Sequence, residues 1–421
     1  MILIKNGFVV SPKNNINRKA DILIDKDIVI KIGDIDEQEG YEIIDAEGMI
    51  VAPGLIDTHV HFREPGMEYK EDIHTGSLAA AKGGFTTVIC MANTNPIIDN
   101  EETLNYCIKK AKNEKINILF ASAITKNFDG KTLVDMNSMK NKGAILFTDD
   151  GIPLSNTKIV FEAMKKAKEL NTVLSFHEED PNLIGSLGVN EGEVSSNFGV
   201  KGAPSISEEV LVARDCAIAL STKATITIQH ISSGESVKII RKFKELGANI
   251  HAEVTPHHFT LTDNILLEKE SLAKCNPPIR EEYHRNKILE GLKDNTIDII
   301  ATDHAPHSVE EKNRGIKDSP SGMIGLETAL SLGISELVNK NIISLSNLIN
   351  KMSVNPSKLY NLNRGIIKEN GIADIVIFDE KESWKVESFL SKSSNSPFIG
   401  ETLEGKVKYT ICNGDIVYQD K

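Results

Sequence analysis

Residues 54–66 have the sequence GLIDTHVHFREPG. This stretch starts as a short apolar run, carries His59 and His61 two positions apart, adds Arg63 at the same spacing and ends in a Pro-Gly turn signal. Side chains two positions apart in a β-strand point to the same face, so the spacing predicts that these three side chains lie together. Two imidazoles on one face can bind a metal ion, and a guanidinium beside them suits an anionic group.

Further short apolar runs follow along the chain, and amphipathic segments separate several of them. The eight runs occupy residues 54–61, 86–93, 116–125, 144–151, 172–180, 225–233, 249–258 and 297–304. Strands that alternate with helices predict a parallel sheet, and eight such units predict a (β/α)8 TIM barrel of the α/β class. A doubly wound open sheet is the alternative, but no G-x-G-x-x-G motif follows the first run.

The two ends of the chain have a different pattern. Short alternating apolar runs with turn signals, such as Asn6-Gly7 and Asn413-Gly414, fill both ends. We therefore predict a small composite β-sandwich domain that both termini form, from residues 1–52 and 361–421. The metal-dependent TIM barrel is expected to occupy residues 53–360.

Charge and composition exclude several classes of function. The net charge is −12, which argues against a general nucleic-acid or membrane-surface role. No apolar run reaches the roughly 18 residues of a membrane span, and the N-terminus lacks a signal-peptide pattern, so we expect a cytoplasmic protein. The five cysteines are scattered and form no C-x-x-C pair, which argues against a disulfide framework or a structural zinc cluster.

Metal-binding residue types stand at the end of several apolar runs. Each alone has an ordinary structural explanation, as a core histidine, a helix N-cap or a turn residue. In barrel enzymes, however, the carboxyl ends of the strands hold the active site. Because residues of these types occur together at one end of the strands, we predict that they bind metal. The predicted ligands are His59, His61, Asp150, His177, His230 and Asp303.

Two other features belong to the same predicted rim. Asn93 and Asn276 lie close to prolines, and turn structure explains both as well as function does. The polar segment 305–325 follows Asp303 and is rich in Gly, Ser and Pro, which is typical of a lid or substrate loop.

Taken together, these motifs resemble the class I bacterial dihydroorotases of the cyclic amidohydrolase superfamily. The motifs run in family order as APGLIDTHVHFREPG (52–66), AAAKGGFTTVICMANTNP (79–96), FTDDG (147–151), AEVTPHH (252–258), NPPIR (276–280) and IDIIATDHAPH (297–307). The resemblance implies a TIM barrel with a composite β-sandwich and one or two zinc ions as the cofactor, and we expect two Zn²⁺ ions per subunit. It implies reversible hydrolysis of the cyclic amide of (S)-dihydroorotate to N-carbamoyl-L-aspartate, the third step of pyrimidine (UMP) synthesis.

The resemblance also assigns roles to residues. It places His59, His61 and Asp303 at the first zinc, His177 and His230 at the second, and Asp150 between them. Asp303 is the catalytic residue, which moves a proton from the attacking water to the leaving ring nitrogen. The implied substrate contacts are His61, Arg63, Asn93, Asn276, His307, Ser321 and Gly322. Ser321-Gly322 stands where the family has Phe-Gly, and the nearest lysine before FTDDG, Lys142, is too early in the chain to supply a carboxylated bridging lysine.

Two alternatives remain open. One is a cyclic amidase of the hydantoinase or allantoinase type, which shares the barrel and the histidines. The other is a non-catalytic dihydroorotase-like partner of aspartate carbamoyltransferase, which is expected to lack metal ligands. We expect a small-molecule substrate, no nucleic acid, no membrane and a homodimer, and leave association with aspartate carbamoyltransferase open.

Overall fold

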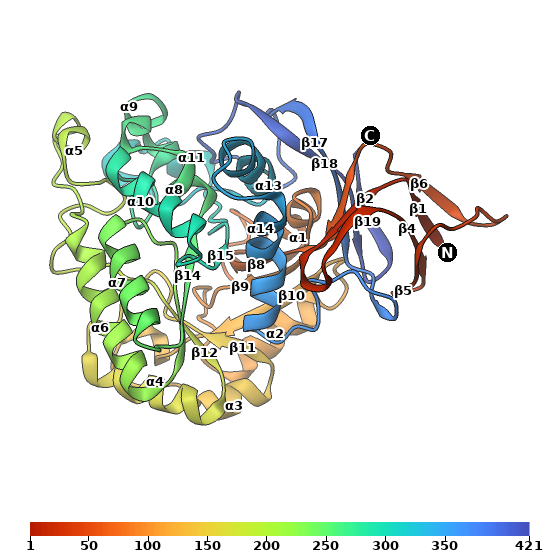
Figure 1. Cartoon of the computed structure of the whole chain (residues 1–421). Helices are drawn as coiled ribbons and strands as arrows, with labels where there is room; N and C mark the ends of the chain where they lie inside the picture. The colour runs from red at the N-terminus through yellow and green to blue at the C-terminus, as the bar shows by residue number, and fades with distance from the viewer. Residues whose placement is uncertain (421) are drawn as a thin grey trace.

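Eight parallel strands alternate with helices in the middle of the chain, as the computed structural model of residues 1–420 shows (Figure 1). The barrel strands are β8 (Leu55–Val60), β9 (Phe85–Cys90), β10 (Asn117–Ser122), β11 (Ala144–Phe147), β12 (Val173–Phe176), β13 (Thr225–Ile228), β14 (Ile250–Val254) and β15 (Ile299–Ile300). They pair in chain order from β8 to β15. The ring closes where Val60 forms a parallel bridge with His304. The predicted TIM barrel is confirmed.

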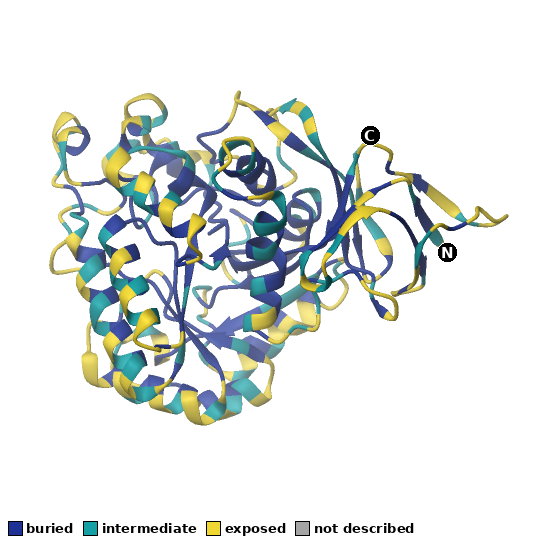
Figure 2. Ribbon diagram, viewed as in Figure 1, coloured by how far each residue is buried: buried dark blue, intermediate teal, exposed yellow. Residues whose placement is uncertain are grey.

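The helices cover the outside of this barrel. Its main helices are α1 (Ile73–Lys82), α2 (Glu101–Ala111), α3 (Met136–Asn141), α4 (Thr157–Leu170), α6 (Ile206–Thr222), α7 (Gly234–Glu245) and α10 (Glu282–Lys293). Every residue of β8 and β9 is buried, as expected for strands that are covered on both faces. In α4 the buried residues recur every three or four positions, so one stripe packs inward and the opposite face meets water (Figure 2).

Shorter helices lie mainly in the connections. They are α5 (Glu193–Asn197), α8 (Pro256–Thr260), α9 (Leu266–Lys269), α11 (Val309–Lys312), α12 (Gly315–Asp318), α13 (Ala329–Leu332), α14 (Leu345–Ile349) and α15 (Asn355–Leu359). The last two belong to one long helix beside the barrel, because the π-helical residues Asn350–Val354 join α14 to α15 without a break (Figure 1). None of the helices within residues 1–420 has both the length and the apolar character that a membrane crossing requires.

Both ends of the chain build two further sheets beside the barrel. Their strands are β1 (Ile2–Lys5), β2 (Phe8–Ser11), β3 (Ile16–Lys19), β4 (Asp21–Asp25), β5 (Ile28–Gly33), β6 (Glu42–Asp45), β7 (Ile50–Pro53), β16 (Gly371–Ile372), β17 (Ile375–Lys385), β18 (Thr402–Cys412) and β19 (Asp415–Gln419). One sheet has the order β16-β5-β4-β1-β6 and the other β19-β18-β17-β7-β2-β3. Each sheet therefore mixes strands from both termini, and Figure 1 shows the red and blue strands side by side.

A shared apolar core joins the two sheets. Ile4 and Ile22 from one sheet and Val51 and Ile375 from the other belong to one buried cluster, and all four are fully buried. Burial of such side chains is the main favourable term that holds two sheets face to face. The composite β-sandwich expected from both termini is present.

The connection between β17 and β18 leaves this sandwich and reaches the barrel. Residues 386–401 form it, and several of its polar side chains are buried. Ser393 Oγ donates to the carbonyl oxygen of Lys70 at 2.7 Å, and Lys82 Nζ donates to the carbonyl oxygen of Ser388 at 3.1 Å. The sandwich is thus tied to the loop that follows β8 and to the last residue of α1.

Candidate metal and substrate site

A cavity of about 160 Å³ opens at the carboxyl ends of the barrel strands. Its lining residues are His61, Arg63, Asn93, Asp150, Gly151, His177, His230, Asn276, Asp303, Ala305, His307, Ser321 and Gly322. The structure therefore brings together the residues that the sequence placed at the site. His59 is 1% exposed and contacts Asp150 from beneath the cavity wall.

The ends of the strands position these side chains. His59 lies within β8, and His61 and His177 each follow the last residue of a strand directly. Asp150 and Asp303 lie three residues beyond β11 and β15. Since all barrel strands are parallel, these ends meet at one rim, as the sequence predicted.

Strand alternation does not position Arg63, contrary to the prediction. β8 ends at Val60, and Arg63 has a φ of 60°, in the left-handed region that few non-glycine residues adopt. A turn, and not the face of a strand, therefore directs the guanidinium into the cavity. His230 and Asp303 also have positive φ angles, of 28° and 48°, and such backbone strain concentrates at functional sites.

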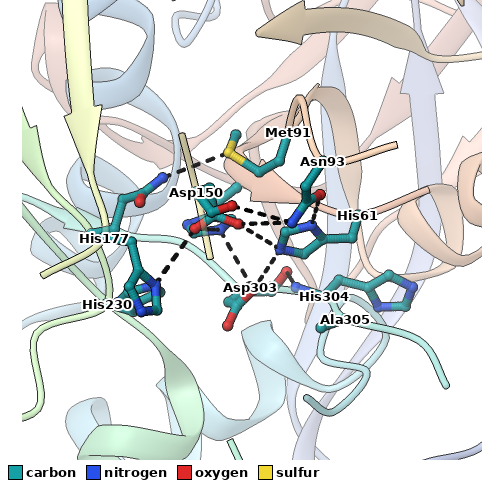
Figure 3. A network of polar contacts seen from close by, with 12 residues as sticks. His61, Met91, Asn93, Asp150, His177, His230, Asp303, His304 and Ala305 are labelled. Atoms are coloured by element: carbon teal, nitrogen blue, oxygen red, sulfur yellow. Dashed lines mark hydrogen bonds and ion pairs between the residues drawn. The ribbon is translucent and has the colours of Figure 1, made fainter. Parts of the chain in front are cut away.

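Asp150 lies between two groups of histidines (Figure 3). Its Oδ1 is 3.3 Å from His59 Nε2 and 3.8 Å from both His177 Nδ1 and His230 Nε2. Its Oδ2 is 3.4 Å from His61 Nε2. One carboxylate thus faces both groups, as a residue that bridges two cations would.

Asp303 completes the first group. Its Oδ1 is 2.9 Å from His61 Nε2 and 3.5 Å from His59 Nε2. Burial favours the uncharged carboxyl, but the charges of His59 and His61 and the hydrogen bond from His61 outweigh it and lower the pKa of Asp303. Burial likewise opposes a charge on His59, but Asp150 and Asp303 raise the pKa of His59 well above its usual value. The two carboxylates therefore favour positive charge on His59, whereas burial keeps the pKa of His61 below its usual value.

The donor atoms suit metal ions. Those of His59, His61 and Asp150 lie within 4.8 Å of one another, and so do those of Asp150, His177 and His230. Both ring nitrogens of His59 are buried and have no hydrogen-bond partner within residues 1–420. Imidazole nitrogens and carboxylate oxygens are common zinc ligands. The two groups could each hold a metal ion and share Asp150.

Polar side chains behind the imidazoles fix their orientation. Asn93 Oδ1 lies 2.8 Å from His61 Nδ1, and Glu179 Oε2 lies 3.0 Å from His177 Nε2. In each ring the other nitrogen then faces Asp150, which is how outer partners orient metal-binding histidines. Sequence reasoning missed the role of Glu179, although its position two residues after His177 was a usable signal.

Asn93 has a different set of contacts from the one expected. Its Oδ1 contacts His61, and its Nδ2 donates to Asp150 Oδ2 at 3.3 Å. The amide therefore joins two of the candidate metal ligands, although Asn93 also lines the cavity. A substrate contact by Asn93 stays a prediction.

Arg63 brings a positive charge to the lining of the cavity. Arg63 Nε donates to the carbonyl oxygen of Pro306 at 3.2 Å, and Arg63 Nη2 approaches His307 Nε2 at 3.5 Å. His307 Nε2 donates to the carbonyl oxygen of Ser321 at 2.9 Å, and Lys70 Nζ donates to His307 Nδ1 at 3.2 Å. Burial and the charges of Arg63 and Lys70 lower the pKa of His307, so the ring is neutral. A guanidinium has five donors, and these contacts leave others free for an anion.

The chain is similar to known dihydroorotases over its whole length. It is 60% identical to a dihydroorotase from Clostridioides difficile, with 99% of this chain and 100% of the relative covered. It is 53% identical to a dihydroorotase from Lactococcus lactis and 54% identical to one from Streptococcus pneumoniae, with 100% of each chain covered. A family model described as dihydro-orotase-like matches residues 48–236. The chain belongs to the dihydroorotase family.

Solved structures with the same fold include a hydantoinase and a dihydropyrimidinase. An L-hydantoinase (dihydropyrimidinase) from Arthrobacter aurescens superposes with a TM-score of 0.90 at 25% identity, covering 99% of this chain and 96% of that chain. A dihydropyrimidinase from Brevibacillus agri gives a TM-score of 0.87 at 24% identity, covering 100% and 95%. These likenesses support the barrel and sandwich architecture, while the family assignment comes from the full-length dihydroorotases.

Two further observations bear on the ligand set of this family member. His258 has both ring nitrogens engaged, by Thr255 Oγ1 at 2.8 Å and the carbonyl oxygen of Pro277 at 3.0 Å, so its role is structural. Lys142 pairs with Glu101 at 3.2 Å, and both side chains are nearly half exposed. Lys142 is therefore remote from Asp150, in agreement with the expectation that it supplies no bridging group.

Proposed function

We propose that this chain is a zinc-dependent dihydroorotase, which hydrolyses (S)-dihydroorotate to N-carbamoyl-L-aspartate and closes the ring in the reverse direction. One observation carries the proposal beyond family membership. A single cavity is lined both by the histidine and carboxylate cluster and by Arg63. Dihydroorotate has both a cyclic amide to be cleaved and a carboxylate to be bound, so its two functional parts match these two groups of lining residues.

The candidate ligands divide into two sets. His59, His61 and Asp303 would hold one zinc, His177 and His230 would hold a second, and Asp150 would contact both. A bound zinc lowers the pKa of a coordinated water and polarises a carbonyl group. Support for the second position comes from His177 Nδ1 and His230 Nε2, which face each other at 2.9 Å and both point toward Asp150.

Asp303 is the proposed proton carrier. Its carboxylate is at the cavity surface, although the residue is only 8% exposed, and it contacts His61 at 2.9 Å. In hydrolysis it accepts a proton from the attacking water and delivers it to the ring nitrogen as the amide C–N bond breaks. In ring closure the same carboxylate handles the proton in the opposite direction.

The remaining residues are proposed to hold the substrate. Arg63 binds the substrate carboxylate through two N–H groups in a fork, and the neutral His307 lies beside it. Asn276 lines the cavity from the opposite loop, and its Oδ1 is buried without a hydrogen-bond partner within residues 1–420. That free acceptor suits an amide N–H of the ring. Ser321 and Gly322 would complete the wall behind the carboxylate.

A pair of substrates tests this function. The purified protein is expected to hydrolyse dihydroorotate and to close N-carbamoyl-L-aspartate, with dialysis against a chelator abolishing both reactions and added zinc restoring them. Dihydrouracil has the same ring without the carboxylate and is expected to react with a kcat/KM lower by about 100-fold, because the Arg63 fork has no partner. Equal turnover of both substrates would contradict the proposal and favour a hydantoinase-type amidase.

The role of Glu179 gives a separate prediction. Glu179→Gln is expected to weaken metal binding at the second position by about 10- to 100-fold, because Gln is a poorer acceptor for the His177 Nε2–H. Metal retained after dialysis against graded chelator concentrations measures the loss.

Glu178→Gln is the matched control. Burial and the neighbouring Asp215 raise the pKa of Glu178 well above its usual range, so this site disfavours a charge and an amide of the same shape is expected to replace the carboxyl at little cost. If both variants lose metal equally, Glu179 has no specific part in orienting His177.

The other expectations stay proposals. The strands of the two terminal sheets end at Pro53 and resume at Gly371, which supports a sandwich domain of residues 1–52 and 361–421 and a barrel domain of residues 53–360. A homodimer and association with aspartate carbamoyltransferase rest on the resemblance to the family alone, and a cytoplasmic location rests on the sequence pattern alone.

A further inference from the structure

A buried asparagine from the terminal domain reaches the substrate side of the cavity. Asn395 lies in the 386–401 connection between β17 and β18 and is 3% exposed. Its neighbours Ser393 and Ser396 are also buried, so this part of the connection is packed inside the molecule. Asn395 is not among the residues that line the cavity.

The side chain of Asn395 links the two arms of the substrate loop. Its Nδ2 donates to the carbonyl oxygens of Ala305 and Gly322, each at 3.0 Å. Its Oδ1 accepts from the backbone N–H of His307 at 3.0 Å. Both amide hydrogens and the carbonyl oxygen of one side chain therefore hold the backbone of three residues that line the cavity.

The Gly322 carbonyl is the centre of this arrangement. Lys312 Nζ also donates to it, at 3.0 Å, and to the carbonyl oxygen of Pro320 at 3.0 Å. A Cβ on Gly322 would lie 2.8 Å from the Cβ of Ala305 and 3.0 Å from His307 Nε2, so the two arms are in close contact. A small movement of Gly322 would therefore displace the His307 ring or open a gap beside it.

We propose that Asn395 is a positioning residue that sets the shape of the substrate pocket by fixing His307 and Gly322. It acts through these two residues and touches neither the substrate nor the candidate metal ligands. The inference rests on the proposed function, because it assigns the pocket to dihydroorotate. It also makes the sandwich a contributor to the site, since the residue comes from a connection between two sandwich strands.

The amide group is essential to this role. Aspartate has the same shape and keeps an acceptor for the His307 N–H, but it places a second oxygen against the carbonyls of Ala305 and Gly322. Two acceptors that face each other repel, and buried acceptors without donors cost free energy. Asn395→Asp should therefore push the arms apart, while Asn395→Ala should leave them unlinked.

The experiment compares steady-state kinetics of the full-length, metal-loaded protein and its variants. Asn395→Ala and Asn395→Asp are each expected to raise KM for dihydroorotate by about 10-fold or more, with kcat changed by less than about 3-fold, because a displaced pocket wall weakens binding and leaves the ligand cluster intact. Metal content is expected to equal that of the wild type.

Asn355→Ala is the matched control for loss of an asparagine side chain. Asn355 Nδ2 donates to the carbonyl oxygen of Asp298 at 2.8 Å, at the amino end of β15, away from the cavity. It is expected to lower the melting temperature and to leave KM unchanged. If Asn395 had only a structural role, its variants would likewise have a lower melting temperature and an unchanged KM.

The outcomes separate the two proposals. A wild type that does not hydrolyse dihydroorotate would overturn the proposed function, and this inference with it. An active wild type whose Asn395 variants keep their KM would overturn the inference alone. If Asn395→Ala does not fold, the KM of Asn395→Asp decides. Hydrogen exchange then tests the bond to the His307 backbone N–H directly. Because aspartate keeps the acceptor, this amide should stay protected in Asn395→Asp.

Discussion

Asp303→Asn is expected to yield a folded, metal-binding protein whose kcat for dihydroorotate falls by roughly 10²- to 10⁴-fold. Asparagine keeps the size and one oxygen of aspartate, so it can still lie beside His61, where Asp303 Oδ1 is now 2.9 Å from Nε2. It cannot accept and return a proton. The loss should appear in both reaction directions, because the same group handles the proton in hydrolysis and in ring closure. Stopped assays of both reactions, together with metal analysis, measure it.

The opposite end of the same strand supplies the control. Asp298 lies directly before β15, pairs with Lys244 at 2.5 Å and accepts from the backbone N–H of Ala252 at 3.0 Å. Asp298→Asn should therefore lower stability and leave kcat unchanged, as expected for the stability face of a barrel. Asp303→Asn with near-normal turnover would remove Asp303 from proton transfer.

The barrel could be predicted because its signal is local. Buried parallel strands appear as short runs of apolar, β-branched residues, and each of the eight runs overlaps a barrel strand. The limits of the strands were less predictable. The run at 297–304 contains only the two-residue strand Ile299–Ile300, because the chain leaves the sheet before Asp303, which has a left-handed backbone.

The candidate ligands could be predicted for a related reason. They lie within the strands or at most three residues after them, so chain order alone places them at one rim. Arg63 shows the limit of this reasoning, because the residue reaches the cavity through a turn and not through the predicted strand alternation. The sequence contains no signal for the φ of a single non-glycine residue.

Residues that support the ligands and the pocket were the hardest to find. Glu253 Oε2 lies 3.5 Å from His59 Nδ1, and Asn395 holds the His307 backbone. Asn395 and His307 are 88 positions apart in the sequence, and Glu253 and His59 are farther apart still. Their residue types are ordinary at these positions. Only the fold brings them to the site, so single-sequence reasoning had no basis for choosing them.

Arg63→Lys is expected to raise KM for dihydroorotate by about 10- to 100-fold with a much smaller effect on kcat. Lysine keeps the positive charge but loses the planar fork, and one hydrogen bond to a charged group is worth about 1.5–3 kcal/mol. The loss should be confined to substrates that carry the carboxylate. Dihydrouracil, which lacks it, should react equally slowly with the wild type and the variant, because in neither case does the side chain at position 63 have an anion to bind.

Arg364→Lys is the matched control for this substitution. Arg364 pairs with Asp374 and donates to Asn117 Oδ1 at 3.0 Å and to Asn413 Oδ1 at 3.1 Å, and it does not line the cavity. This variant should lose stability and keep its KM. Since Arg63 and Arg364 each make several hydrogen bonds, a KM effect found only for Arg63 would assign the fork to the substrate. An unchanged KM in Arg63→Lys would instead show that the guanidinium only holds Pro306 and His307 in place.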